Sequence, residues 1–150
     1  MNKKFPLQSV LDLSQMKLEE ASRRLGELIS GERRASERLG LLIQYRDEYR
    51  VRFLDAARDG LGREQWHNFQ QFLSQLDTAI GQAQEMLSQS HELTATGQRE
   101  WLDHRGRVKA FDTLALRHHT RVAYEESHRE QKILDEHAAR MHNAGSKREE

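Results

Sequence analysis

Eight histidines are the residues with the clearest potential for chemistry in this chain of 150 residues. A metal site on one helix requires ligands three or four positions apart, because only those side chains share a face. No two histidines have that spacing, and the neighbours His118 and His119 point about 100° apart on a helix. We therefore expect histidines that face solvent or the edge of a helical interface, and no metal site.

Carboxylates are the second group that could carry chemistry. They lie among basic residues, as at Glu19 and Glu20, whereas a catalytic carboxylate needs an enclosed site in which burial shifts its pKa. Gly60 and Gly62 lack the lysine and hydroxyl of a phosphate-binding loop. Cysteine is absent, which excludes disulfides and thiol chemistry. We expect no enzyme, no cofactor and no small-molecule ligand.

The amino-acid composition limits which folds the chain can adopt. Hydrophobic residues make up 36% of the chain and charged residues 32%, against about 45–50% apolar residues in globular domains. This is too little apolar surface for a thick core, but a coiled coil buries only about two positions in seven. Basic and acidic residues number 24 each, and this balance argues against a nucleic-acid binder.

The first part of the chain carries apolar residues in steps of four and three. Of 14 positions in this register, 11 are apolar. The positions are Leu7, Leu11, Ser14, Leu18, Ala21, Leu25, Leu28, Glu32, Ala35, Leu39, Leu42, Arg46, Tyr49 and Phe53. This heptad seam predicts a helix from about Leu7 to Arg58.

A bend and a second helix follow. The segment Asp59–Gly62 is the strongest helix breaker, and Gly60 can adopt the positive φ of a helix end. The second seam consists of Phe69, Leu73, Leu76, Ile80, Ala83 and Leu87, then weakly Ser90, Thr94 and Gly97, then Trp101, His104, Val108, Phe111, Ala115, His118 and Val122. We expect the second helix from about Arg63 to His142, followed by a frayed tail.

A short bend makes long helices antiparallel neighbours. The sequence therefore predicts a single all-α domain, an antiparallel two-helix coiled-coil hairpin whose longer second helix overhangs the start of the first. Three facing pairs are predicted near the bend: Leu42 with Ala79, Tyr45 with Leu76, and Tyr49 with Phe72. The alternative is a three-helix bundle, if the weak stretch 88–97 breaks the second helix.

Aromatic residues near the bend are the best candidates for partner binding. Tyr45, Trp66 and Phe72 lie off the strict seam, and a two-helix fold is too thin to hide all of them. Exposed clusters of aromatic residues mark partner sites, and local overpacking near the bend is the alternative. Basic pairs such as Arg33–Arg34 suggest either a solvated face or binding to an acidic protein groove.

Targeting signals are not evident. No apolar run approaches the roughly 18 residues of a membrane span. The basic start of the chain, Met1–Pro6, lacks the apolar stretch of a secretory signal. We expect a cytoplasmic protein.

Two segments of the chain resemble the FliJ family of the bacterial flagellar type III export apparatus. They are Leu39–Arg50, LGLLIQYRDEYR, and Trp66–Ile80, WHNFQQFLSQLDTAI. The resemblance implies an antiparallel coiled coil similar to the central stalk of rotary ATPases. It also implies a role in flagellum biogenesis, and through it in motility and chemotaxis.

The resemblance implies three partners. They are the hexameric export ATPase FliI, the cytoplasmic domain of the gate protein FlhA, and free export chaperones. The implied location is cytoplasmic, peripherally associated with the inner membrane at the flagellar base. A generic coiled-coil scaffold and a substrate-specific export chaperone remain as alternatives.

The resemblance also implies site residues. Family positions that face the gate protein match here at Leu42, Tyr45, Tyr49, Phe72, Leu76 and Ala79. Two positions depart from the family pattern, because Arg38 stands where relatives have glutamine and Ala83 where they have histidine.

Overall fold

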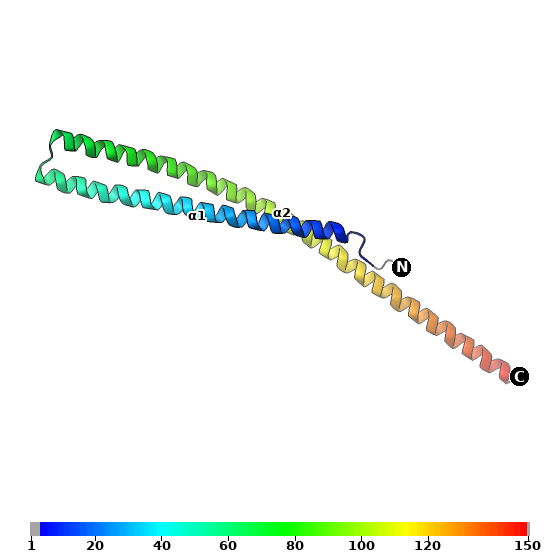
Figure 1. Ribbon diagram of the computed structural model, residues 1–150. Helices are drawn as coiled ribbons and strands as arrows, with labels where there is room; N and C mark the ends of the chain where they lie inside the picture. Colours follow the sequence, from blue (N-terminus) through cyan, green and yellow to red (C-terminus); the bar gives the residue numbers. More distant parts are fainter. Residues whose placement is uncertain (1–3, 150) are drawn as a thin grey trace. The chain divides into compact units, whose positions relative to one another are not determined.

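The computed structural model describes residues 4–149, and nearly all of them are helical. Helix α1 spans Gln8–Asp59 and helix α2 spans Arg63–Arg148 (Figure 1). The two helices pack against each other as an antiparallel pair, which confirms the predicted hairpin. Because α2 is unbroken across 88–97, the three-helix alternative is wrong. Residues 1–3 of the basic start and residue 150 of the predicted tail lie outside the described residues.

The connection between the helices is set by two glycines. Gly60 has a φ of 94°, and its amide donates to the Ala57 carbonyl at 3.3 Å, which ends α1 as predicted. Gly62 is the N-cap of α2, because its carbonyl accepts the amide of Trp66 at 3.0 Å. The side-chain oxygen of Gln65 accepts the Gly62 amide at 3.4 Å, which is half of a capping box.

Contacts within the chain divide it into two units. The hairpin unit consists of residues 18–103 and includes the connection. The terminal unit consists of the chain up to Lys17 together with the part of α2 from His104 onward.

Small and polar residues bring the two helices of the hairpin unit close together. Ala21 and Ala83 are buried, and a Cβ atom at Gly97 would lie 2.6 Å from the Cδ1 atom of Leu28. The hydroxyl of Thr94 donates to the Leu28 carbonyl at 3.4 Å. The stretch that looked weak in sequence is therefore a place of close helix packing.

Hydrogen bonds and ion pairs between the helices lie along the same seam. The indole nitrogen of Trp101 donates to the hydroxyl of Ser22 at 2.8 Å. Interhelical ion pairs join Arg24 to Glu100 at 3.1 Å and Arg46 to Asp77 at 3.9 Å. A ring nitrogen of His91 also contacts the Glu32 carboxylate.

The predicted seam is confirmed over most of its length. Every predicted position from Leu11 to Phe53 on α1, and from Phe69 to Val122 on α2, is buried or half-buried. Leu7 is the exception at 40% exposed. Its carbonyl accepts the amide of Leu11, so Leu7 is the N-cap of α1 rather than a seam residue.

In the terminal unit, residues before the first helix complete the seam. The side chain of Phe5 is buried, and its ring centroid lies 5.7 Å from that of His118. Residues 127–148 of α2 are exposed throughout, in agreement with the predicted overhang.

The predicted end of α2 near His142 is wrong, because the helix continues to Arg148. One glycine, Gly145, costs a helix only about 1 kcal/mol. Lys147 and Arg148 lie in the last turn, where positive charge stabilises the helix dipole. Neither α1 nor α2 has a segment long and apolar enough to cross a membrane.

The close approach at Gly97 predicts opposite effects for two glycine substitutions. Gly97→Leu should lower the free energy of unfolding by about 1–3 kcal/mol, because the new side chain displaces that of Leu28. Gly81→Ala, at an open position of the same helix, should raise it by about 0.5–1 kcal/mol through helix propensity. Urea denaturation measures both, and equal effects would contradict the packing described for Gly97.

Candidate protein-binding surface

Five aromatic rings from both helices meet near the connection. They are Tyr49 and Phe53 of α1 and Trp66, Phe69 and Phe72 of α2. The Tyr49 ring centroid lies 4.4 Å from that of Phe72 and 5.1 Å from that of Phe69. Phe53 lies 5.0 Å from Trp66 and 5.4 Å from Phe69. Tilted rings at these distances stabilise each other in addition to the apolar surface that they bury. This aromatic cluster therefore holds the two helices together next to the connection.

Three aromatic side chains near the connection stay largely in solvent. Tyr45 is 51% exposed, Trp66 49% and Phe72 42%, which confirms the expectation that off-seam rings cannot all be hidden. Trp66 and Phe72 each touch one ring of the aromatic cluster and present the rest of their surface outward. Exposed aromatic surface anchored in this way is typical of protein-binding sites.

A shallow groove forms where the two helices expose Tyr45 and Phe72. Tyr45, Tyr49, Phe72 and Leu76 line it, with Glu48 and Arg52 at its charged side; we call it the tip groove. It brings together four of the six predicted site residues and contains two predicted facing pairs, Tyr45 with Leu76 and Tyr49 with Phe72. The ring contact between Tyr49 and Phe72 confirms the second of these pairs directly.

The remaining two predicted residues lie beside the tip groove. Leu42 is half-buried and lines a neighbouring hollow on α1 together with Tyr45. Ala79 is half-buried three residues after Leu76 and lines neither hollow. The six residues therefore lie in one neighbourhood, but the structure does not show Leu42 and Ala79 in contact.

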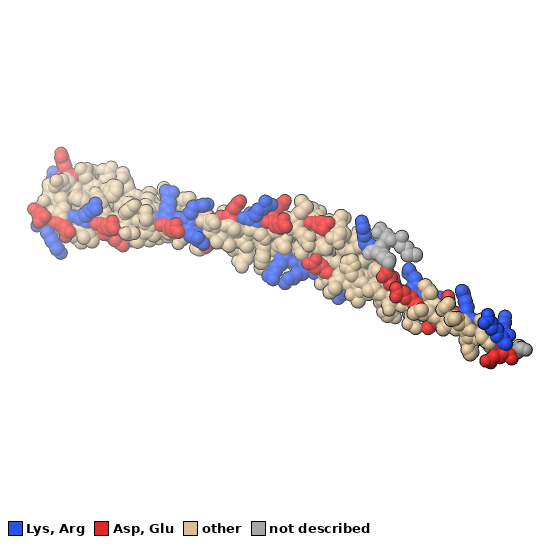
Figure 2. All heavy atoms as spheres, turned by 60° about the horizontal axis from the view of Figure 1, so that its bottom comes forward, with Lys and Arg blue, Asp and Glu red and all other residues tan. Residues whose placement is uncertain are grey.

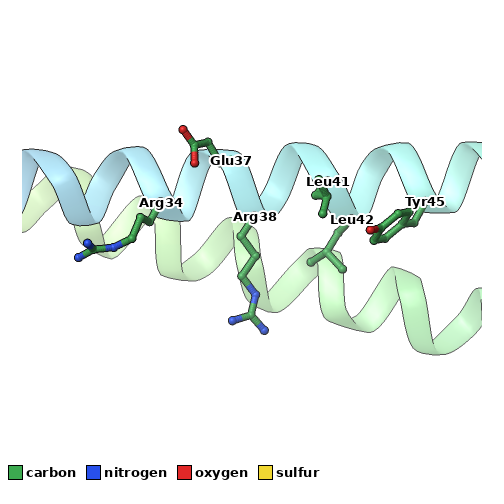
Figure 3. A pocket seen from close by; sticks show the side chains of 6 residues that line it. All are labelled: Arg34, Glu37, Arg38, Leu41, Leu42 and Tyr45. Atoms are coloured by element: carbon green, nitrogen blue, oxygen red, sulfur yellow. The ribbon is translucent and has the colours of Figure 1, made fainter.

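The neighbouring hollow, which we call the lateral groove, includes residues that the seam pattern did not reveal. Its lining consists of Arg34, Glu37, Arg38, Leu41, Leu42 and Tyr45 (Figure 3). Leu41 is 50% exposed although it is a large apolar residue. Its spacing from Tyr45 was a signal in the sequence, since residues four apart share a helix face.

Charges on the surface are mixed. Figure 2 shows basic and acidic side chains alternating along the hairpin unit, with uncharged surface between them. At the seam, Arg46 lies 3.9 Å from Asp77 and 3.4 Å from Asp47. The apolar surface at the tip groove is therefore interrupted by charges of both signs rather than surrounded by one.

The histidines lie where the sequence placed them. His104 and His118 are half-buried in the seam, and the other six are exposed. Within residues 4–149, no three histidine or carboxylate side chains come close enough together to hold a metal ion.

The sequence is similar to known proteins along nearly its whole length. Residues 3–147 match the family model described as flagellar FliJ protein. The flagellar FliJ protein of Escherichia coli strain K12 is 34% identical over 134 residues, which cover 89% of this chain and 91% of the relative. The flagellar FliJ protein of Salmonella typhi is 32% identical with the same coverage. The match thus includes both helices and the connection.

The two tyrosines of the tip groove should differ in their contribution to stability. Tyr49→Ala should lower the free energy of unfolding by about 1–3 kcal/mol, because it removes two ring contacts at the seam. Tyr45→Ala should lower it by less than about 1 kcal/mol, because that side chain is half in solvent. Urea titrations followed by circular dichroism measure both values. A larger loss for Tyr45 would contradict the assignment of the two rings.

Proposed function

This chain belongs to the FliJ family, whose members are components of flagellar protein export, and we propose that it links the export ATPase to the export gate. In this proposal the tip groove binds the cytoplasmic domain of the gate protein FlhA. The terminal unit enters the hexameric ring of the ATPase FliI as a stalk. The chain also escorts export chaperones between rounds of export.

The exposed aromatic surface of the tip groove is the observation that supports gate binding. Tyr45 and Phe72 expose about half of their surface while neighbouring rings hold the groove in place. Exposed rings in such a groove can bind a partner with a small loss of side-chain conformational entropy, because the aromatic cluster already fixes part of the surface. Leu42 and Ala79 extend the proposed contact along α1 and α2.

The helical overhang supports the proposed contact with the ATPase ring. Residues 127–148 form a single exposed helix, and a lone helix is narrow enough to enter the pore of a ring. The exposed side chains of Ile133, Leu134 and Met141 offer apolar contacts there.

Coupling between the two partners follows from the continuity of α2. The helix contributes Phe72 and Leu76 to the tip groove and then continues without a break into the overhang. Coupling means that binding at one site changes the free energy of binding at the other. Through these two contacts the chain is held at the inner-membrane base of the flagellum.

Removing one exposed ring tests the proposed gate contact. Tyr45→Ala should weaken binding to the purified cytoplasmic domain of the gate protein by about tenfold, as expected for an aromatic anchor worth about 1.4 kcal/mol. Isothermal titration calorimetry measures the dissociation constant. Helix content should not change, because the Tyr45 side chain is half exposed and lies off the strict seam.

Tyr124→Ala is the matched control for this experiment. Tyr124 is 70% exposed and belongs to the terminal unit, so its removal should leave gate affinity unchanged. Undiminished binding by Tyr45→Ala would rule out the tip groove as the gate contact.

A second measurement separates the proposed function from a generic scaffold. Adding the full chain to the purified export ATPase should raise its rate of ATP hydrolysis several-fold, because a stalk in the ring favours ring assembly. Tyr45→Ala should stimulate equally well, since that residue lies in the hairpin unit. An unchanged rate of ATP hydrolysis would favour the alternative of a generic coiled-coil scaffold.

A different result would favour the other alternative, a substrate-specific export chaperone. That result is a stable one-to-one complex of this chain with a single export substrate.

A further inference from the structure

The lateral groove holds two arginines beside exposed apolar side chains. Arg34, Arg38, Leu41 and Tyr45 follow one another by four, three and four residues, so they lie on one face of α1. Figure 3 shows Arg34, Arg38 and Tyr45 projecting to one side of the helix and Glu37 projecting to the other. The apolar side chains therefore have positive charge next to them, and Glu37, which also lines the groove, points away from the two arginines.

Arg34 and Arg38 have no ion-pair partner among the described residues. Arg34 and Arg38 are exposed, and no ion pair joins them to a carboxylate among residues 4–149. In the same unit, Arg24 and Arg46 each pair with an acidic residue of α2. Two like charges four residues apart on a helix repel each other, so carboxylates placed beside both would relieve an unfavourable interaction.

The lining residues of the lateral groove all come from α1. Phe72 and Leu76 of the tip groove are continued at helical spacing by Ala79, Ala83 and Met86, which lie on one face of α2. Met86 is 55% exposed. Ala79 is half-buried and Ala83 is buried, so the apolar surface exposed on this face of α2 comes mainly from Phe72 and Met86.

We infer that the partner of the tip groove places carboxylates against Arg34 and Arg38, next to the apolar contact at Leu41 and Tyr45. The inference rests on the proposed function and concerns the same partner, the cytoplasmic domain of the gate protein. Arginine suits this role because its planar guanidinium can bind a carboxylate through two parallel hydrogen bonds. The apolar part of the surface supplies affinity, and the two arginines fix the orientation of the partner along α1.

Reversing the two charges tests the inference. Arg34→Glu with Arg38→Glu should weaken binding to the purified gate domain about tenfold, because two attractions become repulsions. Arg34→Lys with Arg38→Lys keeps the charge and should bind within about threefold of the wild-type chain. Raising sodium chloride from about 50 to about 500 mM should weaken the wild-type complex much more than that of the glutamate variant.

Arg117→Glu with Arg121→Glu is the matched control, since these two arginines are also four apart and exposed but belong to the terminal unit. It should bind the gate domain like the wild-type chain. Urea midpoints of all variants should match, because both arginines of the lateral groove are exposed.

The outcomes separate the inference from the proposed function. If the glutamate variant binds as tightly as wild type while Tyr45→Ala loses affinity, the arginine contact is wrong and gate binding stands. A loss that the charge-preserving lysine variant shares equally would also overturn the inference. If the wild-type chain does not bind the gate domain, the proposed function and the inference both fail.

Discussion

The two helices are held together along a line of side chains that is too narrow to enclose most of its own members. Ala21, Ile80 and Ala83 are deeply buried in the hairpin unit, whereas most other seam residues are only half-buried. Each seam residue removes little apolar surface from water. The free energy of unfolding is therefore the sum of many small contributions along the helices rather than the product of one core. The same narrowness forces aromatic rings near the connection to remain partly exposed, and it thereby creates a surface that a partner can use.

Two polar members of the seam, Thr94 and Glu32, have partners on the opposite helix, and this fixes how the helices are aligned. Thr94 donates to the Leu28 carbonyl, and Glu32 pairs with His91. A shift of one helix along the other would leave these groups without partners in a partly buried place, which costs free energy. Apolar contacts alone would tolerate several alignments. The polar pairs therefore keep Tyr49 opposite the rings of α2 that complete the tip groove.

Much of the fold could be predicted from the sequence, because a repeat of four and three residues has few other interpretations. The exposure of Leu7 and the continuation of α2 beyond His142 were missed, since helix ends depend on local hydrogen bonds and charges rather than on the seam. The close packing at Gly97 was missed because a glycine looks like a weakness until the side chain that fills its space is known. The lateral groove was missed as well, since a pattern of charges does not reveal that Arg34 and Arg38 have no ion-pair partner among residues 4–149.

The short connection at Gly60 also bears on how the molecule acquires its structure. Bringing two chain segments together costs more entropy as the loop between them grows, and the rings of Phe53 and Trp66 are separated by few residues. Pairing of the two helices therefore costs least entropy next to the connection and proceeds outward from it. Each helical turn that pairs shortens the loop that the next turn must close. Residues far from the connection, such as Phe5 and His118, meet only after the intervening helices have zipped together. Such a chain emerging from the ribosome cannot begin this pairing until the start of α2 has been synthesised.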